Sequence, residues 1–162
     1  MASTVVASTL TVTLTESISL NGQSFGGTRS YSIASINEIY KRILTIPADA
    51  DTTVVSFKSA TSTSDVALDI QDAKYLRISN LDNSNTINLS LQIDAGEDDS
   101  AADESATIAL APGQSFIMGS PHDSIAVSDA NATIVTDLHD LESVLIDSSS
   151  NAVDVEVFVA ST

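Results

Sequence analysis

Apolar and polar residues alternate with a period of two along most of this chain, which is the pattern of β-strands with one buried face. The first long example is TLTVTLTESISL at Thr9–Leu20, in which leucine and valine alternate with threonine. The last is AVDVEVFVA at Ala152–Ala160, where four valines fall on one side and polar residues with Phe158 fall on the other. Residues with this period cannot present a continuous apolar stripe on a long helix. The pattern therefore restricts the chain to folds built from strands.

The strand candidates are short, and turn-forming residues separate them at intervals of about 8–12 positions. We therefore predict an all-β fold, an antiparallel β-sandwich or jelly roll of about eight to ten short strands. The only helical indication lies at residues 35–42, where Ser35 and Glu38 have capping-box spacing. At most one short helix is expected there. Residues 9–162 are predicted to form a single β-sandwich domain, and residues 1–8 are predicted to be a flexible N-terminal arm.

Turn chemistry suggests how the strands connect. The segment NGQSFGG at Asn21–Gly27 combines asparagine with glycine, which tolerate positive φ. Because it separates Thr9–Leu20 from a second strand candidate at Arg29–Ile36, it predicts a long hairpin. Two further hairpins are predicted, one from Tyr75–Ser79 with Thr86–Ile93 and one from Thr107–Leu110 with Ser115–Met118.

The charge of the chain is strongly asymmetric. All six lysines and arginines lie within the first 77 residues, together with 7 of the 22 acids, so this part carries 6 − 7 = −1 and the remaining residues carry −15. Binding to nucleic acid requires clustered basic residues, so no nucleic-acid partner is expected. No apolar run approaches a membrane span, and the N-terminus lacks the pattern of a secretory signal. We expect a soluble chain made in a cytoplasm, without a membrane partner.

Candidate catalytic and metal-binding patterns are weak. Gly22–Gly26 fits the G-x-S-x-G pattern of serine hydrolases, with Ser24 as nucleophile and His139 downstream, but that elbow requires a strand–turn–helix. His122 and His139 lack zinc-site spacing and are expected to be solvated loop residues. The acidic stretch Asp94–Glu104 does not match the EF-hand pattern and is expected to be a solvated, mobile loop. We predict no enzymatic activity, no cofactor and no metal, with any weak cation binding by the acidic loop left open.

A family resemblance is carried by two segments. KYLRISNLDNSNTINLSLQI at Lys74–Ile93 and IALAPGQSFIMG at Ile108–Gly119 resemble small β-rich virion proteins of tailed bacteriophages. In those proteins a tyr-leu-arg-ile-x-asn strand, an Asn-rich turn, a second strand and a leu-x-pro-gly turn recur. The ending VDVEVFVAST is similar to their closing strand. The resemblance implies a structural subunit that works through interfaces, and it transfers no functional residues.

Within that resemblance, the role we expect is a head decoration or cement protein that contacts the major capsid protein or other virion subunits as a homo-oligomer, with a trimer favoured. Its location would be the virion, assembled in the host cytoplasm. A tail, neck or baseplate component is the alternative, since the hairpin over Thr9–Ile36 suits ring closure. A carbohydrate- or receptor-binding β module is the second alternative. The residues predicted to dock a partner are the six basic ones: Arg29, Lys41, Arg42, Lys58, Lys74 and Arg77.

Overall fold

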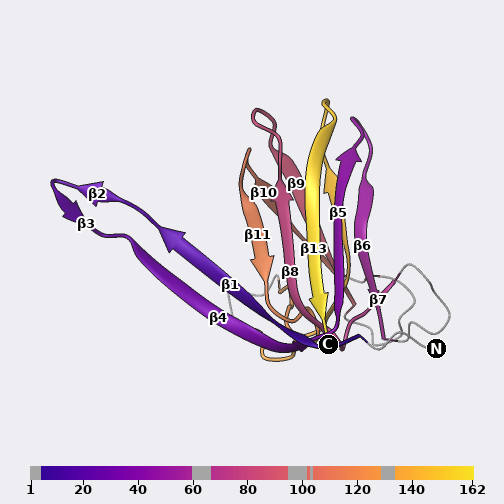
Figure 1. Cartoon of the computed structure of the whole chain (residues 1–162). Helices are drawn as coiled ribbons and strands as arrows, with labels where there is room; N and C mark the ends of the chain where they lie inside the picture. The colour runs from indigo at the N-terminus through magenta and orange to yellow at the C-terminus, as the bar shows by residue number, and fades with distance from the viewer. Residues whose placement is uncertain (1–4, 60–66, 95–101, 103, 129–133) are drawn as a thin grey trace.

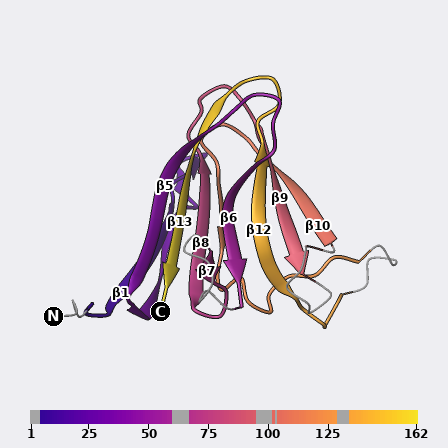
Figure 2. The ribbon, with the colours of Figure 1, turned by 90° about the vertical axis from the view of Figure 1, so that its right-hand side faces the viewer.

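Two β-sheets pack face to face in the computed structural model of the chain, which describes residues 5–59, 67–94, 102, 104–128 and 134–162 (Figures 1 and 2). The predicted antiparallel sandwich is therefore confirmed. The four-stranded sheet has the order β11 (Ser115–Met118), β8 (Ala73–Asn80), β13 (Val153–Ser161), β5 (Glu38–Ile46). The five-stranded sheet has the order β10 (Glu104–Leu110), β9 (Ile87–Asp94), β12 (Asp140–Asp147), β6 (Thr52–Lys58), β7 (Leu68–Asp69). Only the short β6–β7 pair is parallel among the described strands.

The core fills the space between the two sheets and is almost entirely aliphatic. The four valines of β13 are buried, as their alternation predicts. They meet side chains from the facing sheet, among them Leu89, Leu141 and Ile146, in one continuous cluster. Phe57 is the largest side chain buried there. Burial of this kind of surface is the main contribution that favours folding.

The chain passes from one sheet to the other between two pairs of consecutive strands that the sequence predicts to be hairpins. β8 belongs to the four-stranded sheet and β9 to the five-stranded sheet, and the same is true of β11 and β10. The two hairpins predicted from these segments are therefore wrong, because each connection is an arch over the core. Alternation places one face of each strand inside but does not say whether its neighbour lies beside it or across the core.

The helical turn considered for residues 35–42 does not form. β4 (Gly27–Ile36) runs into β5 with Asn37 alone between them, and Ser35 has a φ of 64°. Pairing of β5 with β13 along nine positions, Glu38 to Ile46, gives one edge of β5 a ladder of main-chain hydrogen bonds, and β5 is the edge strand of its sheet. A capping signal alone cannot outweigh nine paired positions in a sheet. No described helix is long and apolar enough to cross a membrane.

A long hairpin extends away from the sandwich, as Figure 1 shows. Its main part is β1 (Ser8–Glu16) paired with β4, and its tip is β2 (Ser19–Leu20) paired with β3 (Gln23–Ser24). Asn21 and Gly22 have φ values of 52° and 80° and form the two-residue connection at the tip. Positive φ at both positions is the signature of a type I′ turn. The hairpin predicted from the sequence is confirmed.

Part of the predicted organisation falls on residues that are not described. Of the N-terminal arm, residues 1–4 lie outside the described part, and Val5 and Val6 are exposed. Residues 95–101 and 103, most of the acidic stretch, also lie outside it. The domain assignment stays a prediction.

Candidate interaction surface

The hairpin has two chemically different faces because its side chains alternate. One face carries hydroxyl groups in cross-strand contact, which satisfy one another and bind water. These pairs are Thr11–Ser32 at 3.3 Å, Thr13–Ser30 at 2.9 Å and Thr15–Thr28 at 3.3 Å. The other face is formed by the pairs Leu10–Ile33, Val12–Tyr31, Leu14–Arg29 and Glu16–Gly27, so it is apolar near the base and carries its two charged residues towards the tip.

The base of the hairpin packs its apolar face against the outside of the four-stranded sheet. Leu10, Val12 and Ile33 are partly buried against a small second cluster. That cluster is made of Ile36, Tyr75 and Ala160, with Phe158 beside them. The outward-facing residues of β8 and β13 therefore hold the hairpin in place.

Beyond this base, the hairpin leaves its apolar side chains uncovered. We call residues 14–29 the distal arm. Leu14 is 57% exposed and Phe25 is 63% exposed, and Ile18 and Leu20 are exposed to a similar extent. Solvent-exposed apolar side chains gathered on one projecting segment are a common mark of an interaction site.

The outer face of the four-stranded sheet carries a compact charged group. Glu156 accepts hydrogen bonds from Arg77 and pairs with Lys41 at 3.1 Å. The Arg77 hydrogen bond, followed by that from Lys41, holds the pKa of Glu156 below its usual value. The guanidinium of Arg77 also lies 5.9 Å from the centre of the Phe158 ring, within cation–π range.

An open cleft of about 300 Å³ lies where the hairpin diverges from the sheet. Tyr75 and Phe158 contact each other edge to face there, with ring centres 5.9 Å apart. Burial, and then the nearby Tyr31, raise the pKa of the Tyr75 phenol, although Arg77 opposes them. The lining consists of Leu10, Thr11, Val12 and Thr13 from the hairpin and Tyr75, Arg77, Ile117 and Phe158 from the sheet.

The six basic residues do not gather on a single face. Lys41 and Arg77 meet at Glu156. Arg42 faces the other side of β5, in a groove of about 450 Å³ between β5 and β6. Arg29 lies on the hairpin, Lys58 lies at the end of β6, and Lys74 donates a hydrogen bond to the carbonyl of Gln71. Their assignment to partner docking stays a prediction.

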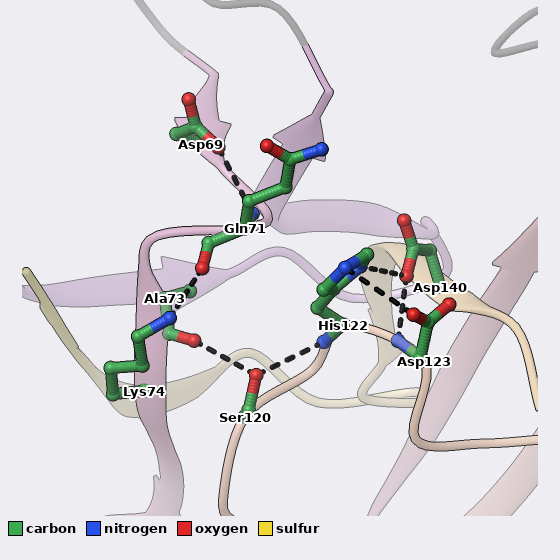
Figure 3. A network of polar contacts seen from close by, with 8 residues as sticks. All are labelled: Asp69, Gln71, Ala73, Lys74, Ser120, His122, Asp123 and Asp140. Carbon is green, nitrogen blue, oxygen red and sulfur yellow. Dashed lines mark hydrogen bonds and ion pairs between the residues drawn. The ribbon is translucent and has the colours of Figure 1, made fainter.

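A histidine between two carboxylates was not expected from the sequence (Figure 3). His122 Nδ1 lies 2.7 Å from Asp140 Oδ1, and His122 Nε2 lies 3.3 Å from Asp123 Oδ2. Asp140 also accepts the main-chain N–H of Asp123 at 2.7 Å. His122 lies in a loop, as expected, and its side chain is 36% exposed, but the ring is held by two carboxylates instead of being freely solvated. The overlooked signal is that His-Asp occurs twice, at 122–123 and 139–140, on segments joined by the Ile125–His139 bridge.

The same network fastens a loop to the sandwich. Ser120 donates a hydrogen bond to the carbonyl of Ala73 at 3.1 Å and accepts one from the His122 N–H at 3.4 Å. As arranged, each ring nitrogen of His122 faces a carboxylate. An imidazole nitrogen with two carboxylates is also a donor set that a divalent cation can use. In this geometry His122 and Asp123 attach the loop to Asp140 of β12, and we call this group the His122 clasp.

The hydrolase pattern is not in the context that its chemistry requires. Ser24 lies in β3, at the exposed tip of the hairpin, and the next element is the strand β4. His139 pairs with Ile125 next to the start of β12, in the sandwich. A nucleophile elbow needs a strained turn between a strand and a helix. Gly22 instead forms part of the turn at the hairpin tip, and Gly26 allows the close approach of the Glu16 main chain.

Comparison with known proteins gives little further guidance. No protein-family model matches the chain, and no curated protein matches it. A solved structure with partial similarity comes from Bacillus endospore appendages, described as a novel family of disulfide-linked pili. It is 14% identical, covers 75% of this chain and 84% of that chain, and has a TM-score of 0.38. A likeness at that level carries no argument about function.

Proposed function

We propose that this protein is a non-enzymatic structural subunit of a bacteriophage particle, most suited to the role of a head decoration or cement protein. Its partners would be the major capsid protein or other virion subunits, together with copies of itself, with a trimer favoured. Its location would be the virion, after assembly in the host cytoplasm. The resemblance of Lys74–Ile93 and Ile108–Gly119 to small phage virion proteins supports this choice of particle.

The observation that carries the proposal is the exposed distal arm. A rigid sandwich with a projecting hairpin suits a protein that reaches over a joint and holds a neighbour. Arms and strand edges are recurrent means of subunit assembly. Where the partner is also acidic, contact has to rest on apolar side chains, because like charges oppose docking. Leu14 and Phe25 provide such side chains.

Two other roles have some support in the structure. A tail, neck or baseplate component is favoured by the length of the hairpin, since such an arm can link subunits around an axis. A carbohydrate- or receptor-binding module is favoured by Tyr75 and Phe158, which line the cleft beneath the hairpin.

Quantitative mass spectrometry of purified particles tests the proposal. The copy number of this chain would be measured against that of the major capsid subunit. A ratio close to one would support decoration, and a few copies per particle would move the protein to the tail, neck or fibres. Absence from particles would overturn a virion role.

A further inference from the structure

We propose that the distal arm of one copy binds the outer face of the four-stranded sheet of a second copy, so that the protein associates head to tail. This inference rests on the proposed structural role and names the partner of the arm. We call the receiving surface the acceptor face. It is formed by Lys41, Ile43, Arg77, Ile117, Asp154 and Glu156.

The first argument is continuity with a contact that already exists within the molecule. Leu14 follows Leu10 and Val12 on the apolar face of the hairpin. The first two pack against the outer face of the sheet, whereas Leu14 is uncovered. Leu14 thus extends the apolar side chains that this sheet already accepts at the base of the hairpin, with Arg29 paired opposite it.

The acceptor face has uncovered apolar side chains of its own. Ile43 is 62% exposed and Ile117 is 47% exposed. Ile43 lies opposite Glu156 in the ladder and Ile117 lies opposite Arg77, so both isoleucines flank the charged group. An apolar surface bordered by satisfied polar groups is the usual composition of a protein interface.

Charge selects a second copy as the occupant. The hairpin, residues 8–36, contains Glu16 and Arg29 and is therefore neutral, whereas the rest of the chain carries 5 − 21 = −16. The acidic sandwich domains of two copies repel each other, whereas the neutral hairpin of one copy is not repelled by the other copy. The acceptor face is locally balanced as well, with Lys41 and Arg77 against Asp154 and Glu156. Because the arm is neutral and the acceptor face is balanced, the arm of one copy can contact the face of another without like-charge repulsion between the two surfaces.

The shape of the molecule makes the contact intermolecular. The distal arm extends away from the sandwich on the β11 side (Figure 1), whereas only the base of the hairpin lies over its own sheet, at the cleft that Arg77 and Ile117 line. Donor and acceptor are different surfaces, and a contact between them is heterologous. Such contacts close into a ring when the rotation between copies allows it. A ring of three would match the trimer favoured for a decoration protein.

The test measures self-association of the full chain by analytical sedimentation and compares it with that of two double variants and one single control variant. The arm variant is Leu14→Ser with Phe25→Ser, and the face variant is Ile43→Ser with Ile117→Ser. Ile134→Ser is the matched control, since Ile134 is 88% exposed and lies on neither surface. The substituted side chains are 47% to 88% exposed, and circular dichroism checks that each variant is folded. We expect association of the parent chain and the control, and dissociation constants at least about tenfold higher for the arm and face variants.

Mixing the arm variant with the face variant is the decisive step. Each is expected to be monomeric alone, and the mixture is expected to form one-to-one pairs, because one still has a face and the other still has an arm. Association is also expected to strengthen with salt, which screens the acidic bodies. A monomeric parent chain, unchanged association of either variant, or absence of pairing in the mixture would overturn the inference. None of these results depends on whether the protein is found in phage particles.

Discussion

Asn80, in the four-stranded sheet, donates a side-chain hydrogen bond to the main-chain carbonyl of Leu110, in the five-stranded sheet, at 3.1 Å. The same amide donates to the carbonyl of Asn85 at 2.8 Å, and its oxygen accepts the N–H of Asp82 at 3.0 Å. Asn80 is 1% exposed. One buried side chain thus fixes the arch from β8 to β9 and joins it to the end of β10. Asn80 therefore has a structural role in the segment Lys74–Ile93.

Substitution of Asn80 is predicted to destabilise the fold strongly. Asn80→Ala leaves the Leu110 carbonyl without its partner inside the protein and is expected to cost about 2–3 kcal/mol. Asn80→Asp keeps the shape but places a carboxylate against carbonyl oxygens, so its cost should be larger at neutral pH. Urea unfolding monitored by circular dichroism measures both. Equal stability of all three proteins would contradict this role.

The Glu156 contacts predict a pH dependence. Since the pKa of Glu156 is lowered in the folded state by Arg77 and Lys41, its contribution to stability is complete above the ordinary glutamate pKa of 4.5 and is lost as the pH falls through the lower folded value. Glu156→Gln should cost about 1 kcal/mol at pH 7, after allowance for solvent screening. The difference from the parent chain should shrink in acid. A difference that is constant from neutral pH down to acid pH would refute this assignment.

Gly26 is predicted to be required for the shape of the hairpin tip. A Cβ atom at Gly26 would lie 2.2 Å from the main-chain oxygen of Glu16, whereas one at Gly27 would meet nothing within 4 Å. Gly26→Ala should therefore open the tip, and Gly27→Ala should not. The measurement is hydrogen exchange of the Phe25 amide, which donates to the Ile18 carbonyl at 3.0 Å. The melting temperature should shift by less than about 2 °C, because the tip lies outside the core.

The aliphatic core predicts a large cost for a single truncation. Leu141 is fully buried in β12. Leu141→Ala should reduce the free energy of unfolding by about 3 kcal/mol through lost burial and the cavity left behind. Ile134→Ala, at an exposed position, should change it by less than about 0.5 kcal/mol. Similar losses for the two variants would show that the core is not placed as described.

Strand positions could be predicted from the sequence because they depend on local alternation. Ser115–Met118 and Ala152–Ala160 were recognisable as strands for this reason, and they correspond to β11 and β13. The partners of strands are a different matter. The turn after Asn80 contains asparagine and aspartate, which suit an arch as well as a hairpin, so local chemistry did not reveal that β8 and β9 lie in opposite sheets.

The candidate surface was only partly accessible from sequence. The turn residues Asn21 and Gly22 predicted the hairpin. They did not predict that its outer half is exposed, because the alternation of Leu10, Val12 and Leu14 indicates one buried face along the whole strand. Only the packing against Tyr75 and Phe158 shows where burial ends. The His122 clasp depends on residues 18 positions apart that meet through the fold.

The length of the distal arm has a consequence for how copies meet in solution. The nine positions from Leu14 to Gly22 at the tip span up to about 30 Å at about 3.3 Å per residue. Electrostatic repulsion between exposed charges decays over a Debye length of about 8 Å at physiological ionic strength. A neutral strand pair of this reach can touch a neighbour while the two acidic bodies are still outside each other's field. The hairpin therefore keeps the attractive contact at a distance from the acidic sandwich domains. A shorter hairpin would bring those domains close enough to repel each other.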